Sequence, residues 1–143
     1  MGYLKDFLNP GGKVFLAFPP WRMPFGGHQQ ICRSKFLSKL PYFHIGPVFC
    51  YRGMLKLFGE SPETIENLLE VKSTGLSIAR FRKIVRENGY QFDRETLFFI
   101  NPNYEVKFKL KTRKLWAAFN LPFFRDFFTT THYSVISRSE KPQ

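Results

Sequence analysis

The sequence is poor in cysteine and has no long apolar run. Its two cysteines, Cys32 and Cys50, are too few for a disulfide framework, and neither belongs to a C-x-x-C pair. A reducing, cytoplasmic compartment is therefore expected. No stretch approaches the roughly 18 apolar residues that a membrane span requires, and the N-terminus lacks the succession of basic, apolar and small residues of a signal peptide. We therefore expect a soluble protein with no membrane partner.

Acidic residues are also scarce. The chain has 11 Asp and Glu against 22 Lys and Arg, which gives a formal net charge of +11. Such a charge favours acidic partners when it is concentrated on one face. Here the basic residues are spaced along the chain, and no block of five or six occurs. The pattern predicts a generally basic surface with at most weak association with nucleic acid.

Several catalytic and nucleotide-binding patterns are missing. There is no G-x-S-x-G, no G-x-x-x-x-G-K and no G-x-G triplet. The first two absences argue against hydrolase and nucleotidase chemistry. The third removes the glycine turn through which backbone amides approach a dinucleotide-like cofactor closely.

What is present is enough for one globular unit, expected over residues 1–143. Hydrophobic residues make up 43% of the chain, and 18 residues are Phe. Residues 3–8 resemble the last turn of a helix, which Asn9-Pro10-Gly11-Gly12 ends. The apolar run 14–18 follows and predicts a strand buried on both faces, as in a parallel sheet.

The rest of the chain alternates helices and strands. We expect helices over 29–40, 48–58 and 62–72, a helix of period 3.6 over 76–88 that Gly89 closes, and strands over 96–100 and 132–137. The first three helices look like an insertion rather than part of the main sheet.

In its order of elements the chain resembles the C-terminal part of class I S-adenosylmethionine-dependent methyltransferases. In that family a Pro-Gly-Gly turn leads into the fifth strand, a helix crosses to the sixth, and a seventh strand returns antiparallel between them. The matching segments are the Pro10-Gly11-Gly12 turn with its strand, the helix 76–85 with Asn88 and Gly89, and the closing strand 132–136.

The resemblance implies an α/β fold: three strands of a Rossmann-like methyltransferase sheet, the last antiparallel, with helical insertions. Segments 19–74 and 101–131 would be insertions on the substrate side. The cofactor-binding half would lie upstream, so S-adenosylmethionine belongs to the complete enzyme and no cofactor residue is expected here. The acceptor and the catalytic residues stay unknown, and the fragment alone is expected to be inactive. It is also expected to self-associate through an exposed strand edge.

Four residues follow the ends of expected strands and are candidates for substrate binding: Trp21, His28, Asn101 and Tyr104. Open α/β sheets bind ligands at the carboxyl ends of their strands. His28 could act as a general base, because imidazole exchanges protons near neutral pH. The alternatives are that Trp21 and Tyr104 pack, that His28 is a surface residue and that Asn101 caps a turn.

Two other functions remain open at this point. His28 and Cys32 are four residues apart and could share one helix face as metal ligands, but zinc needs further ligands and we expect no metal site. The basic and aromatic stretch 107–114 could make the chain a small module that binds RNA or another polyanion.

Overall fold

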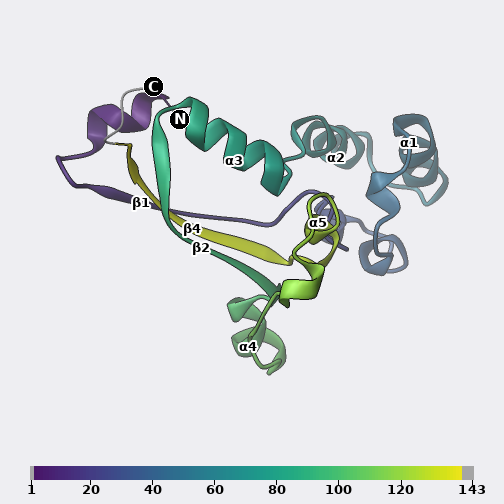
Figure 1. Cartoon of the computed structure of the whole chain (residues 1–143). Helices are drawn as coiled ribbons and strands as arrows, with labels where there is room; N and C mark the ends of the chain where they lie inside the picture. The colour runs from purple at the N-terminus through teal and green to yellow at the C-terminus, as the bar shows by residue number, and fades with distance from the viewer. Residues whose placement is uncertain (1, 140–143) are drawn as a thin grey trace.

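The computed structural model describes residues 2–139, which form an antiparallel four-stranded sheet with helices on one face and at one end (Figure 1). The strands are β1 (Lys13–Phe18), β2 (Tyr90–Ile100), β3 (Arg113–Lys114) and β4 (Thr131–Arg138). The α-helices are α1 (Val48–Leu57), α2 (Pro62–Thr74), α3 (Ile78–Glu87), α4 (Pro102–Phe108) and α5 (Arg125–Phe128). Five 3₁₀ turns complete the fold: η1 (Gly2–Phe7), η2 (Gln29–Ile31), η3 (Leu37–Lys39), η4 (Phe43–Ile45) and η5 (Ala117–Phe119).

The strand order is β1-β4-β2-β3, so the last strand lies between the first two. β4 pairs antiparallel with β1, where Val14 faces Ile136, and antiparallel with β2, where Leu97 faces His132. β1 and β2 consequently run in the same direction, and the long connection between them ends with α3. The expected α/β fold and the antiparallel last strand are confirmed, but the sheet has four strands rather than three and all its neighbouring strands pair antiparallel. The strand expected over 96–100 is part of the longer strand β2. Neither β3 nor α4 was expected.

α3 covers one face of the sheet. It begins at Ser77, whose hydroxyl oxygen accepts a hydrogen bond from the Arg80 amide at 3.1 Å, and it ends before Gly89, which adopts φ 68°. Its apolar stripe packs on the sheet to form one core with Phe81, Val85, Tyr90 and Ile136 at its centre.

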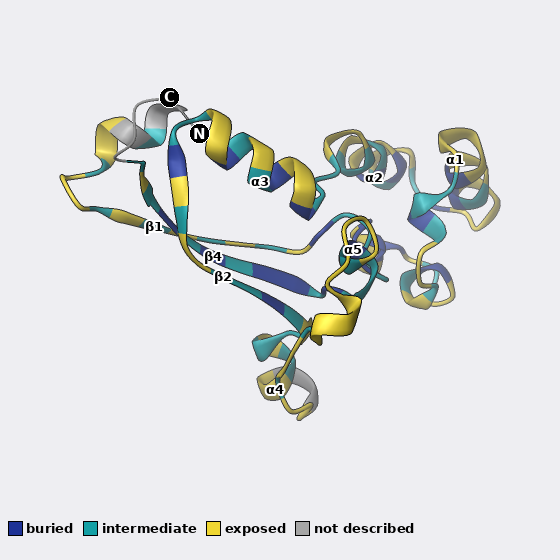
Figure 2. Cartoon of the chain, viewed as in Figure 1, coloured by how far each residue is buried: buried dark blue, intermediate teal, exposed yellow. Residues whose placement is uncertain are grey.

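The opposite face of the sheet is uncovered, which contradicts the expectation that the first strand is buried on both faces (Figure 2). Phe15 is 60% exposed, and its ring contacts Tyr133 edge-on at 5.3 Å. Tyr133 contacts Phe98 at 5.1 Å. A shallow hollow of about 260 Å³ lies here. We call this surface the open face; its main residues are Phe15, Arg94, Thr96, Phe98, Tyr133 and Val135.

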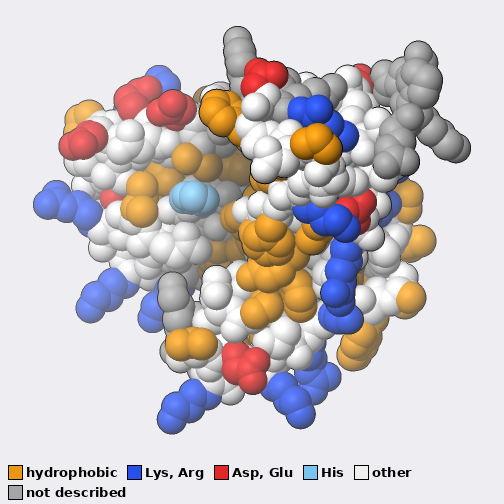
Figure 3. Space-filling model, turned by 90° about the vertical axis from the view of Figure 1, so that its left-hand side faces the viewer, with side chains coloured by type: hydrophobic (Ala, Val, Ile, Leu, Met, Phe, Trp, Pro, Cys, Tyr) orange, Lys and Arg blue, Asp and Glu red, His pale blue; other side chains and the backbone are white. Residues whose placement is uncertain are grey.

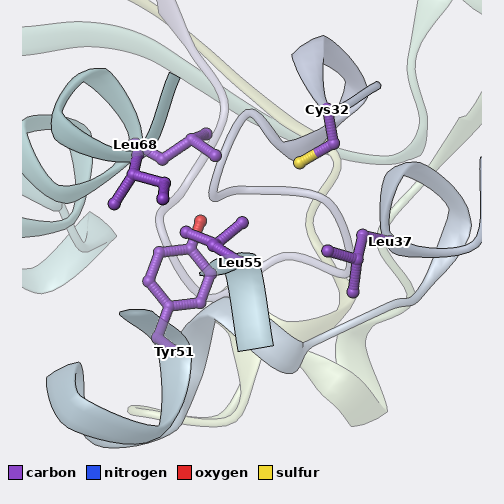
Figure 4. Close-up of a cluster of buried hydrophobic side chains, with 6 residues drawn as sticks. Cys32, Leu37, Tyr51, Leu55 and Leu68 are labelled. Carbon is purple, nitrogen blue, oxygen red and sulfur yellow. The ribbon is translucent and has the colours of Figure 1, made fainter. Parts of the chain in front are cut away.

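A second core holds the helical insertion together. Leu37, Tyr51, Leu55 and Leu68 are fully buried and converge with Cys32 between α1, α2 and the preceding 3₁₀ turns (Figure 4). α2 begins as its sequence predicts, with Ser61 as the cap and Pro62 in the first turn. The burial of Cys32, together with the nearby carboxylate of Glu60, raises the pKa of its thiol to about 11.

The helix expected over 29–40 is wrong, because side chains replace the helical backbone hydrogen bonds there. The Gln29 amide nitrogen donates to the carbonyls of Pro24 and Leu40, and the Glu60 carboxylate accepts from the Arg33 and Ser34 amides at 3.0 and 2.9 Å. Only the short turns η2 and η3 form. In the described residues no helix has the length and apolar character that crossing a bilayer demands.

Candidate functional site

Both long excursions leave the sheet at the same end. The pairing places Phe18, the last residue of β1, opposite His132, and Phe98, near the end of β2, opposite Thr131. Segments 19–75 and 101–130 therefore start or finish beside one another. Figure 1 shows the 3₁₀ turn η1 and the end of β4 at the other end of the sheet. In open α/β sheets ligands bind at the carboxyl ends of parallel-running strands, so the end of the sheet that the excursions leave is the candidate site.

Trp21 packs where the first excursion leaves the sheet. Its amide donates to the Leu76 carbonyl at 2.9 Å, and its ring lies edge-on to His44 with centroids 4.7 Å apart. A Cβ added to Gly75 would lie 2.7 Å from the Trp21 ring, so the chain can return past the indole only with glycine there. The packing role expected as the alternative is therefore present.

Lys72 fastens the same region from α2. Its ammonium donates to the carbonyls of His44 and Gly46 at 2.6 and 2.8 Å, and it lies 5.6 and 5.4 Å from the ring centroids of Trp21 and Tyr51. Burial lowers the pKa of Lys72 and that of His44, in both cases because the charged form is desolvated. The base of the insertion is thus fixed by one cation between two rings and two carbonyls.

His28 is exposed and adopts a left-handed backbone, with φ 55°. It precedes a 3₁₀ turn rather than a helix, so the helical spacing that would have set it beside Cys32 is absent. Cys32 is buried in the second core. Within residues 2–139 no group of three metal-ligating side chains is gathered.

Asn101 caps α4. Its side-chain oxygen accepts from the Asn103 amide at 2.9 Å, and its carbonyl accepts from the Tyr104 amide at 2.9 Å. The contacts of Trp21 lie with residues 44–76, whereas those of Asn101 lie in the second excursion. The described structure therefore does not bring the four predicted residues into one site.

A charged network that sequence reasoning missed lies between α3 and the sheet. The Glu95 carboxylate accepts two hydrogen bonds from the Arg82 guanidinium, at 2.8 and 2.6 Å, and lies 2.7 Å from Nε2 of the buried His132. Burial opposes ionisation of Glu95, but these hydrogen bonds and the guanidinium charge outweigh it and lower its pKa to about 2. The three residues are far apart in sequence, and no spacing signals that they meet.

A buried carboxylate joins the segment 101–130 to the start of α3. Asp126 on α5 is 3% exposed and accepts a hydrogen bond from the Ile78 amide at 3.3 Å. Burial raises its pKa even though that hydrogen bond and neighbouring arginines oppose the shift. A carboxylate at this position also suits the positive end of the helix dipole.

A largely apolar hollow lies at this end of the sheet, and none of the four predicted residues lines it. A cavity of about 380 Å³, here called the aromatic cavity, lies beside the end of β2 and is lined by Phe99, Ile100, Leu115, Trp116, Phe119 and Phe128. Arg113 on β3 completes the lining. The sequence marks this stretch as aromatic and basic, but nothing in its spacing shows that it encloses a hollow.

On the face drawn in Figure 3, hydrophobic side chains collect near the middle, and Lys and Arg lie both beside them and at the edges rather than in one patch. The exposed Lys109, Lys111, Arg113 and Lys114 belong to the stretch 107–114, of which the side chains of residues 107 and 108 lie outside the described part.

Comparison with protein-family models, curated proteins and solved structures found no match to this chain.

Proposed function

We propose that the chain is the C-terminal part of a class I S-adenosylmethionine-dependent methyltransferase domain. The strand order carries the proposal. β4 lies antiparallel between two strands that run in the same direction, and α3 is the last helix of the connection between those two strands. This is the arrangement of the last three strands of the family that the sequence resembles.

The turn before β1 supports the proposal. Gly11 adopts φ 75°, and a Cβ on Gly12 would lie 2.8 Å from the Asn9 carbonyl oxygen, which accepts a hydrogen bond from the Gly12 amide. Both positions therefore require glycine, as the Pro-Gly-Gly turn of the family has.

The open face and the outer edge of β1 also support it. β1 ends the sheet as described, so its outer edge has no strand partner among residues 2–139. Rossmann-like sheets continue past such a strand and carry helices on both faces. An upstream half would supply both the further strands and the helices over Phe15 and Tyr133.

The residues of this chain do not fit the cofactor. The sequence has no G-x-G turn, and no acidic residue ends a strand beside such a turn. We assign no catalytic residue and derive no step of methyl transfer here. The chain's part in a cytoplasmic transferase would be to close the sheet and to position the acceptor through its two excursions.

An alternative function is a basic module that binds RNA or another polyanion. It is favoured by the exposed Lys109, Lys111, Arg113 and Lys114 beside Trp116, which is 64% exposed. We rank it second because the cations are not gathered into one surface.

The test is calorimetric titration with S-adenosylmethionine of two proteins: this chain, and a longer product that includes the in-frame sequence upstream of Met1. The upstream sequence is expected to encode a strand, a glycine-rich turn and a helix. Only the longer product should bind, because that turn provides the cofactor's amides. Tight binding to the present chain alone, or an upstream sequence without such a turn, would contradict the proposal.

A further inference from the structure

The aromatic cavity has the size and lining of a small-molecule site. At about 380 Å³ it falls at the lower end of the range of about 300–1,000 Å³ typical of ligand pockets. Six of its lining residues are apolar, and the only charged one is Arg113. Such pockets usually combine a hydrophobic body with one or two polar groups that orient the ligand.

The aromatic rings form one continuous wall. Phe119 lies 4.9 Å from Phe128 and 6.1 Å from Trp116, measured between ring centroids. Trp116 is 64% exposed, and Phe99 and Phe119 are nearly half exposed. Leaving this much aromatic surface in water is unfavourable, so a bound apolar group would be stabilised by covering it.

Arg113 gives the cavity a positive charge. Among residues 2–139 it forms no ion pair shorter than 4.0 Å, and the cavity lining contains no carboxylate. Lys114 adjoins it on β3. An acidic group on the ligand would therefore find a guanidinium that is free to form a paired hydrogen bond.

We propose that the aromatic cavity binds a small molecule with a planar apolar body and one acidic group, the body against Phe119 and Trp116 and the acid at Arg113. If the proposed function holds, this molecule is the methyl acceptor or the part of it that the enzyme grips. The inference rests on the proposed function only for that last identification.

A second copy of the chain is a poorer occupant, because the concave shape suits a small molecule better than a flat protein contact. The cavity also lies beside β2 and β3, at one edge of the sheet. An upstream half would add its strands at the other edge, next to β1, and would leave the cavity open.

The experiment uses two fluorescent probes that share an aromatic body: the anionic 1-anilinonaphthalene-8-sulfonate and the uncharged N-phenyl-1-naphthylamine. Both are titrated into the chain and its variants without any methyl donor. Phe119→Ala is expected to weaken both probes at least about fivefold, since it removes a wall of the cavity. Arg113→Gln should weaken the anionic probe about tenfold and change the neutral probe less than about twofold.

Two control variants locate the binding. Phe15→Ala removes a similarly exposed ring from the open face, and Arg80→Gln removes an exposed charge from α3; both should leave the two probes unchanged. Near-ultraviolet circular dichroism and sedimentation establish that each variant is folded and report its oligomeric state.

Three outcomes would overturn the inference. The first is loss of both probes in Phe15→Ala with retention in Phe119→Ala, which would place binding on the open face. The second is an Arg113→Gln variant that still prefers the anionic probe as strongly as the wild type. The third is a Phe119→Ala variant whose oligomeric state changes, which would make the cavity a contact between copies. None of these results depends on the methyl donor, so they are distinguishable from failure of the cofactor titration.

Discussion

Replacing Glu95 with Gln tests whether the network under α3 stabilises the fold through its charge. The pKa of Glu95 falls from its ordinary 4.5 to about 2, a difference that corresponds to about 3 kcal/mol of stability at about 1.4 kcal/mol per pH unit. The side chain is 22% exposed, so solvent screening does not remove most of this. Glu95→Gln should therefore lower the free energy of unfolding at pH 7 by about 3 kcal/mol.

The stabilisation by Glu95 should decrease as the pH falls. Because the pKa of Glu95 is lower in the folded state than in the unfolded state, its contribution is complete above about pH 4.5 and is lost as the pH falls towards 2. By pH 3 about 2 kcal/mol of it should be gone, so the wild type and Glu95→Gln should become more alike in acid.

Urea unfolding followed by circular dichroism at pH 7, 5, 4 and 3 measures the difference between the two proteins. A loss of about 3 kcal/mol lowers the urea midpoint by roughly 1–3 M for the usual range of slopes. The matched control is Glu66→Gln, whose partner Arg52 lies 3.5 Å away with both side chains exposed, and which should cost less than about 0.5 kcal/mol. A constant gap between the wild type and Glu95→Gln from pH 7 to pH 3 would refute the electrostatic reasoning.

Light scattering should show species larger than the 16.9 kDa monomer, because the outer edge of β1 and Phe15 are uncovered. Phe15→Lys should reduce the amount of these larger species. A clean wild-type monomer would count against the proposal that an upstream half covers this edge. Filter binding to single-stranded RNA should be weak and disappear by about 200 mM salt, and retention there with one preferred sequence would favour the polyanion module. Lys72→Met should lower the stability measured by thermal unfolding by about 2 kcal/mol, because the carbonyls of His44 and Gly46 lose their donor. The exposed Lys56→Met should be nearly neutral, and equal effects of the two substitutions would argue against this structural role of Lys72.

Local patterns predicted those parts of the fold that local interactions determine. Ser61 and Pro62 start α2, the stripe containing Phe81 and Val85 places α3 on the sheet, and Gly89 ends that helix. The alternating strand at the C-terminal end was also predicted, and its position between the other two came from the family resemblance.

The predictions from sequence were wrong where side chains distant in sequence determine the backbone conformation. The expected helix over 29–40 is absent because Glu60 and Gln29 take over its backbone partners, and neither contact is visible in a helical pattern. The four candidate residues were chosen for following strands, a criterion that cannot distinguish the capping Asn101 from a ligand-binding side chain. The aromatic cavity needed the fold, because Phe99 and Phe128 meet only after the second excursion has closed.

The central position of β4 affects how the sheet folds during synthesis of the chain. β1 and β2 both pair with β4, yet β4 is the last of the four strands in chain order. During synthesis from the N-terminus, residues 13–100 must therefore leave the ribosome without their central partner and keep two strand edges unpaired. Asp126, which completes the start of α3, is also made late. The sheet should thus form in one late step, and a stop codon before Thr131 would leave no ladder between β1 and β2 rather than a trimmed sheet.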